Sequence, residues 1–159
     1  MATAAASDEP LRVSRVIKAP PPSVYRAFLD PAAIAAWRRP EGMTARIFTF
    51  DPREGGGYRM ALDYVDAGPG VHGKTSERSD AFTGRFVTLV ADQKIVEEVD
   101  FVSDDPQFAG TMRMTTSFEP VPDGTRVTIL VENAPRGIEP ADHDAGIRSS
   151  LASLAAFVE

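Results

Sequence analysis

The order of hydrophobic and polar positions changes its period along the chain. Between Leu11 and Lys18, and again between Thr44 and Asn133, apolar and polar residues alternate, which predicts β-strands with one buried face. Prolines and glycines divide the longer stretch at regular intervals. The predicted strands cover residues 11–18, 44–51, 58–65, 81–90, 94–101, 111–119 and 125–133. The segment from Asp66 to Asp80 is polar and rich in glycine, so we expect a long loop there.

Three segments have the helical period instead. Residues 23–29 follow three prolines and are predicted to form a short helix, and residues 31–37 a second one with Asp30 as its N-cap. A longer helix begins near Pro140 and carries one apolar stripe. The stripe consists of Ile147, Leu151, Leu154 and Val158. Because such a stripe must be buried, and the concave face of the sheet is the large apolar surface available, we expect an α+β fold with helices on one side of an antiparallel sheet.

The composition limits the classes of protein to which the chain can belong. It has 159 residues, 43% of them hydrophobic and 25% charged, which is ordinary for one globular domain. We expect this domain to cover residues 11–159 and residues 1–10 to be flexible. The net charge of −6 argues against nucleic acid and anionic membranes as partners. The sequence has no apolar run of membrane-spanning length and no signal-peptide pattern at its start, which predicts a cytoplasmic location.

The residue patterns indicate neither a metal nor a cofactor. The chain has no cysteine, which excludes disulfides and thiolate metal sites. His72 and His143 are far apart and form no His-x-x-x-His pair. The glycines at 55–57 fit a hairpin turn better than a phosphate-binding loop. We therefore expect no metal site and no bound cofactor.

Large side chains gather on the predicted inner face of the sheet. They are Tyr58, Met60, Leu62, Tyr64, Phe86, Met112, Met114 and Phe118. Two interpretations are open: these residues fill a core against the last helix, or they line a cavity whose ligand also satisfies the tyrosine hydroxyls. From the residues alone, the filled core is favoured. Trp37 either covers the entrance of such a cavity or holds the second helix against the sheet.

Glu97 is the candidate for an inward-facing charge. If Val99 and Phe101 face the core, Glu97 shares their face. An inward carboxylate must be paired, hydrogen-bonded or protonated, which makes it a candidate base or ligand anchor. The alternative, which is favoured, is a β-bulge that turns both Glu97 and Glu98 to solvent. An inward arginine would retain Glu97 by pairing with it, but the sequence identifies no such partner.

Several segments together resemble a known superfamily. The opening APPPSVYRAFLDP (19–31), followed by Trp37, is similar to the start of the START-like, birch-pollen-allergen-like superfamily called SRPBCC. Residues 50–60, 84–101 and 114–135 resemble the sheet of its branch related to the C-terminal domain of the activator of Hsp90 ATPase, and GIRSSLASLAAFVE at the end resembles the terminal helix of bacterial members. The resemblance implies a helix-grip fold, in which a curved sheet of about seven strands wraps around a long C-terminal helix and leaves a cavity between them.

The resemblance does not select one function, because the superfamily includes ligand carriers, cyclases, lipid-transfer domains and co-chaperone modules. The preferred hypothesis is that a small hydrophobic, aromatic or lipid-like molecule binds between the sheet and the last helix. The predicted ligand-binding residues are Trp37, Tyr58, Met60, Leu62, Tyr64, Phe86, Met114, Phe118, Ile147 and Leu151.

Two alternatives belong to other functional classes. One is a cyclase, isomerase or hydrolase that uses the same cavity, with Glu97, Tyr64 or His143 as proton carriers. The other is an interaction module that acts on an Hsp90-type ATPase. The additional amino-terminal domain of eukaryotic activators is not expected in the few residues before Leu11. A monomer and a homodimer are both compatible with the sequence.

Overall fold

A computed structural model describes residues 10–39, 42–64 and 79–159. The order of its elements is one strand, two short helices, six strands and a long helix, with one 3₁₀ turn between the fifth and sixth strands. The strands are β1 (Leu11–Ile17), β2 (Met43–Phe50), β3 (Gly57–Tyr64), β4 (Ser79–Val90), β5 (Lys94–Phe101), β6 (Met112–Val121) and β7 (Gly124–Glu132). The helices are α1 (Pro21–Ala27), α2 (Pro31–Trp37), the 3₁₀ helix η1 (Pro106–Phe108) and α3 (Pro140–Val158).

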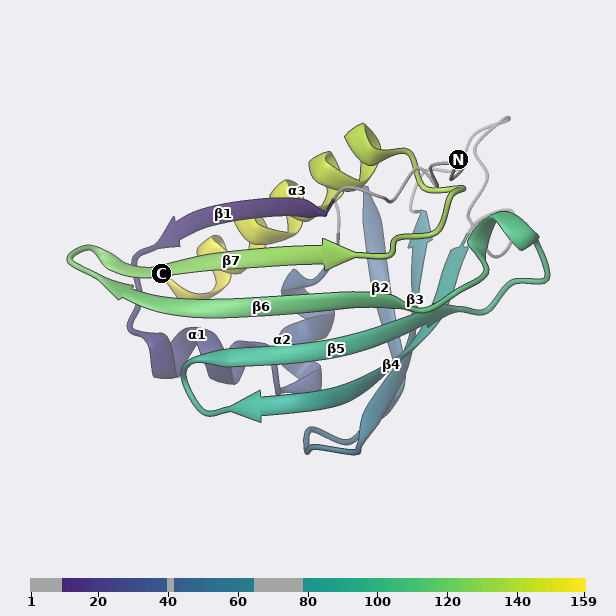
Figure 1. Ribbon diagram of the computed structural model, residues 1–159. Coiled ribbons are helices and arrows are strands. Elements are labelled where there is room, and N and C mark those ends of the chain that lie inside the picture. Colours follow the sequence, from purple (N-terminus) through teal and green to yellow (C-terminus); the bar gives the residue numbers. More distant parts are fainter. Residues whose placement is uncertain (1–9, 40–41, 65–78) are drawn as a thin grey trace.

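The seven strands form one antiparallel sheet in the order β1-β7-β6-β5-β4-β3-β2. Strands β2 to β6 each pair with the next strand in the chain, whereas β1 pairs with β7, from Leu11 opposite Val131 to Ile17 opposite Thr125. Figure 1 shows that the sheet curves around α3, with α1 and α2 on the same side. The predicted α+β helix-grip fold is therefore confirmed.

Two β-bulges contribute to the curvature of the sheet. One lies between Ile47 and Thr49 in β2, and the other between Phe86 and Thr88 in β4. An extra residue in one strand bends that strand and increases its local twist. The sheet can thereby wrap around a helix, which a flat sheet cannot do.

The short helices begin at prolines, as the sequence predicts. Helix α2 has the predicted bounds, and the Asp30 carboxylate accepts a hydrogen bond from the backbone N–H of Ala32 at 3.0 Å. Helix α1 covers Pro21–Ala27, so it begins and ends two residues earlier than expected. The shift arises because Pro21 and Pro22 both fit in the first turn, where a missing N–H costs nothing.

The apolar stripe of α3 is buried against the sheet and the other helices, as expected. Leu151 and Leu154 are fully buried, Ile147 is 7% exposed and Val158 packs against the edge of the core. Helix α3 contacts β1, α1 and α2. A second group of aromatic rings, Tyr25, Phe28 and Phe118, meets edge to face between α1 and β6.

Three details differ from the sequence predictions or lie beyond the described residues. Strand β4 begins at Ser79, two residues earlier than expected, because Ser79 and Asp80 continue its pairing with β3. The 3₁₀ turn at 106–108 was not predicted. Residues 1–9, most of the expected loop at 66–80, and His72 lie outside the described residues.

Candidate functional site

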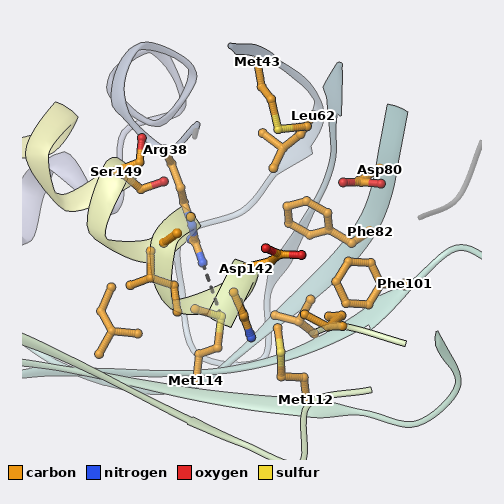
Figure 2. Close-up of a pocket in the computed structure, with 18 of the residues that line it drawn as sticks. Arg38, Met43, Leu62, Asp80, Phe82, Phe101, Met112, Met114, Asp142 and Ser149 are labelled. Atoms are coloured by element: carbon orange, nitrogen blue, oxygen red, sulfur yellow. Dashed lines mark hydrogen bonds between the residues drawn. The ribbon is translucent and has the colours of Figure 1, made fainter. Parts of the chain in front are cut away.

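A cavity of about 890 Å³ lies between the concave face of the sheet and the first half of α3. Its volume falls within the range of roughly 300–1,000 Å³ that is usual for small-molecule sites. Most of its wall is apolar and comes from α2, from β3 to β6 and from α3 (Figure 2). The main apolar residues of the wall are Trp37, Met43, Leu62, Phe82, Val99, Phe101, Met112, Met114, Ile138 and Ile147. The sheet and α3 thus leave an open space between them in addition to a packed core.

Arg38 brings a positive charge into this apolar wall. It is the residue directly after α2, and its backbone N–H donates to the carbonyl of Ile34 at 2.8 Å, which fixes it to the last turn of the helix. From there the side chain extends across the cavity wall toward Met114, as Figure 2 shows. Only 15% of the side chain is exposed. A guanidinium in such a place requires a partner, because a buried lone charge is costly.

Glu97 on β5 is that partner. Its carboxylate accepts from Arg38 Nη1 at 3.0 Å and from Nη2 at 3.4 Å, and the hydroxyl of Tyr58 donates to its Oε1 at 2.6 Å. Glu97 is 1% exposed and Tyr58 is 4% exposed. The Arg38 guanidinium also lies over the Tyr58 ring, with 5.6 Å between Cζ and the ring centroid. We call Arg38, Glu97 and Tyr58 the buried polar cluster.

Burial and charge determine the protonation states in this cluster. Burial opposes the charge of Arg38, but the attraction of Glu97 outweighs it and raises the pKa of the guanidinium, so Arg38 stays charged. Burial raises the pKa of Tyr58 well above its usual value, and the nearby Glu97 carboxylate raises it further against the opposing effect of Arg38. The cluster is therefore an ion pair with a neutral tyrosine that donates to the carboxylate.

The favoured sequence interpretation of Glu97 is wrong. The bulge lies in the neighbouring strand β4, between Phe86 and Thr88, and β5 itself runs without interruption past Glu97. Glu97 therefore stays on the inner face with Val99, while Glu98 faces outward, where it pairs with Arg85 and, at 3.7 Å, with Arg113. Because the bulge lies in β4, inner and outer residues still alternate around Glu97 in β5. The other prediction, an inward-facing Glu97, is therefore correct.

The structure divides the predicted ligand-binding residues into two groups. Trp37, Leu62, Tyr64, Met114 and Ile147 line the cavity. Tyr58, Met60, Phe86, Phe118 and Leu151 are buried in the core and are not among the residues that line it.

Trp37 holds the second helix in place, but against α1 and not against the sheet as one sequence interpretation expected, and it also lines the cavity. It is 1% exposed, its indole N–H donates to the carbonyl of Ala27 at 2.8 Å, and its ring meets Phe28 edge to face. Trp37 thereby links α2 to α1.

The three candidate proton carriers lie at different depths. Tyr64 and His143 line the cavity, whereas Glu97 lies behind Arg38 in the buried polar cluster. The wall also contains Asp80 on β4, Glu139 before α3 and Asp142 in the first turn of α3. Asp80, Asp142 and Phe82 are labelled among the lining residues in Figure 2. Several titratable groups thus meet at this cavity.

Sequence reasoning missed several residues of the wall. Phe82 could have been identified, because it lies four residues before Phe86 on β4 and residues four apart in a strand share one face. Arg38 gave no such signal, because it follows the last residue of a helix and its direction depends on how α2 packs. Asp142 and Ser149 lie on α3 beside the apolar stripe, at positions where polar residues are usually solvated.

Within residues 10–39, 42–64 and 79–159, no three His, Asp or Glu side chains gather in a way that could hold a metal ion. In the same residues, no helix is long and apolar enough to span a membrane.

Comparison with protein families identifies the chain. The model of the family described as "Activator of Hsp90 ATPase homolog 1-like protein" matches residues 18–159. The chain belongs to this family. The resemblance to the SRPBCC superfamily and to its Hsp90 activator-related branch is thereby confirmed. Among curated proteins, none matches the chain.

Solved structures of proteins from other bacteria are similar to this chain. A crystal structure of a protein from Chromobacterium violaceum is 35% identical, with a TM-score of 0.82, and the match covers 95% of this chain and 98% of the other. A solution structure of a protein from Arthrobacter aurescens is 17% identical, with a TM-score of 0.78, over 96% of this chain and 87% of the other. A crystal structure of a protein from Silicibacter pomeroyi is 19% identical, with a TM-score of 0.73, over 93% and 96%. The last two show a likeness of fold alone.

Proposed function

We propose that this member of the family binds a small hydrophobic, aromatic or lipid-like molecule in the cavity between the sheet and α3. The observation that carries the proposal is the cavity itself, about 890 Å³ in volume and lined mainly by apolar side chains. Apolar side chains that line a cavity open to solvent are in contact with water, and a ligand that covers them removes this apolar surface from water.

The composition of the wall supports a ligand of variable shape. Met43, Met112 and Met114 all contribute to it, and methionine adapts to irregular apolar surfaces. Phe82 and Phe101 lie 5.9 Å apart between ring centroids and present aromatic surface to the same space. These side chains favour a flat or flexible apolar molecule over a strongly polar one.

A screen of lipids and flavonoid-like aromatic compounds tests the proposal. Thermal unfolding and native mass spectrometry would be measured for the wild type with each compound. A ligand that binds only the folded protein raises its stability by about 2.7 kcal/mol at one hundred times the dissociation constant, and a domain of this size would then unfold several degrees higher. The proposal fails if no compound of either class raises the unfolding temperature or forms a complex.

A matched pair of variants locates the binding. Ala145 lies on α3 in the cavity wall and is exposed, whereas Ala152, two turns further along α3, is also exposed but is not part of the wall. We expect Ala145→Trp to abolish or strongly reduce the thermal shift, because the indole ring enters the cavity mouth. Ala152→Trp should leave the shift as in the wild type. Equal shifts in both variants would place the ligand elsewhere.

Acid–base catalysis in the same cavity is the second candidate function. The observation that favours it is the presence of Tyr64, Asp142 and His143 in one apolar wall. An enzyme would convert the bound molecule, so a compound from the screen would be recovered chemically changed after incubation. His143→Gln would slow this conversion while the compound still binds. Recovery of every bound compound unchanged would exclude this candidate for the compounds tested.

A further inference from the structure

Arg38 retains hydrogen-bonding capacity toward the cavity. A guanidinium has five N–H groups. Two of them donate to Glu97, and Nη2 also points at the sulfur of Met114, 3.9 Å away, as Figure 2 shows. A thioether sulfur is a weak acceptor. The oxygen atom of a ligand placed against this edge of Arg38 would therefore replace a weak contact by a strong, charge-assisted hydrogen bond.

The charge around Arg38 determines what kind of oxygen atom fits. Glu97 already neutralises the guanidinium at 3.0 Å, so Arg38 has no uncompensated positive charge to offer. The described wall contains three carboxylates, on Asp80, Glu139 and Asp142. An anionic ligand would be repelled by Glu139 and Asp142, and it would also lose its own hydration. A neutral acceptor avoids both costs.

We propose that the cavity selects an uncharged, largely apolar molecule whose carbonyl or hydroxyl oxygen accepts a hydrogen bond from Arg38. This inference rests on the proposed function and narrows its class of ligand. The apolar body of the molecule lies against Met112, Phe82 and Phe101, and its oxygen atom lies beside Met114. Molecules of the same shape that end in a carboxylate are disfavoured.

Three probes with one apolar body test the inference: 4-acetylbiphenyl, biphenyl-4-carboxylate and 4-ethylbiphenyl. Their dissociation constants would be measured by titration of ¹H–¹⁵N correlation spectra, in which the Arg38 Nε–Hε resonance is also followed. A hydrogen bond to a charged donor makes the acetyl compound bind about tenfold more tightly than the ethyl compound. The carboxylate should bind no more tightly than the ethyl compound. The Arg38 resonance should move with the acetyl compound and stay in place with the ethyl compound.

A double variant and a matched control assign the preference to Arg38. Arg38→Met combined with Glu97→Gln removes both charges of the ion pair and should reduce the preference for the acetyl compound to within about twofold. Arg113→Met combined with Glu98→Gln makes the same changes on the outer face of the sheet, where the two residues pair at 3.7 Å. This control should keep the wild-type preference.

The outcomes separate the inference from the function on which it rests. If 4-ethylbiphenyl and 4-acetylbiphenyl bind equally well, or if the carboxylate binds most tightly, the inference is overturned and binding in the cavity stands. A preference that survives in the Arg38 variant also overturns it. If the Arg38 variant does not fold, the movement of the wild-type Arg38 resonance decides. If none of the three probes binds while a compound from the screen does, the inference is overturned and the proposed function stands.

Discussion

At the scale of residues, Arg38, Glu97 and Tyr58 depend on one another. Glu97 is almost fully buried and receives hydrogen bonds from both of the other residues. A buried ion pair of this kind adds little net stability compared with apolar residues of the same volume, because both charges lose their hydration. Removing one partner alone is different, because the remaining charge is then buried without compensation. The cluster should therefore respond very differently to single and double substitutions.

We expect Arg38→Met to lower the free energy of unfolding by about 3–5 kcal/mol, because Glu97 is left buried and unpaired. Adding Glu97→Gln should restore most of this loss, since the amide needs no counter-charge and can still accept from Tyr58. Urea unfolding of both variants measures the effect. Arg113→Met, on the exposed face of β6, is the control and should change stability by less than about 0.5 kcal/mol. Equal losses in the single and double variants would contradict this account of the cluster.

Because of Tyr58, the stability of the protein should depend on pH in alkaline solution. Burial raises the pKa of Tyr58 above its ordinary value of 10.0, so the unfolded chain releases a proton above pH 10 that the folded protein keeps. The contribution of Tyr58 to the free energy of unfolding is constant below pH 10. Above pH 10 it decreases by about 1.4 kcal/mol per pH unit. In Tyr58→Phe this contribution is absent.

The free energy of unfolding of Tyr58→Phe should therefore fall less steeply with pH than that of the wild type between about pH 10.5 and about pH 11.5. Chemical denaturation at several pH values measures both slopes. Tyr25, whose pKa is also raised by burial, is present in both proteins, so its effect cancels in the comparison. Identical slopes would mean that Tyr58 ionises as easily in the folded as in the unfolded protein.

At the scale of elements, the pairing of β3 with β4 makes room for the cluster. Tyr58 on β3 is directly opposite Gly84 on β4, and its ring lies across the space that a side chain at 84 would fill. The backbone of Gly84 does not have a positive φ, so the need for glycine here is one of space alone. A larger residue would displace the Tyr58 ring and its hydroxyl.

Gly84→Ala should therefore destabilise the protein by about 1–3 kcal/mol, the usual cost of adding atoms to a packed interior. The loss should be smaller in a Tyr58→Leu background, because the ring that meets the new methyl group is gone. A double-mutant cycle by urea unfolding measures this coupling. Additive losses would show that the alanine is accommodated without moving Tyr58.

The elements themselves were largely predictable from local patterns. Strand alternation and the single apolar stripe of α3 depend on nearest neighbours in the sequence, which is why β5 and α2 were predicted with their exact bounds. The orientation of Arg38 is different, because it follows the end of α2 and is set by the packing of that helix. The position of the bulge was also beyond prediction, since it concerns the register between β4 and β5 and determines where Glu97 points.

At the scale of the whole molecule, the curved sheet is wider than one helix can fill. The second half of α3 is packed into the core through Leu151 and Leu154, whereas the first half borders the cavity through Ala145, Ile147 and Ser149. Small and polar residues in this half leave space that larger side chains would occupy. The sequence could predict which residues face inward, but not how completely α3 would fill the concave side. Only five of the ten predicted ligand-binding residues consequently line the cavity.

The most direct test of the account is to observe a ligand inside the cavity. Isotope-filtered nuclear Overhauser spectra of the protein with 4-acetylbiphenyl detect which methyl groups lie within about 5 Å of the probe. The account predicts contacts to both walls at once: the methyl groups of Met112 and Met114 on β6 and those of Ile147 on α3. Contacts confined to apolar residues on the surface, such as Val16, Val102 or Phe157, would contradict it.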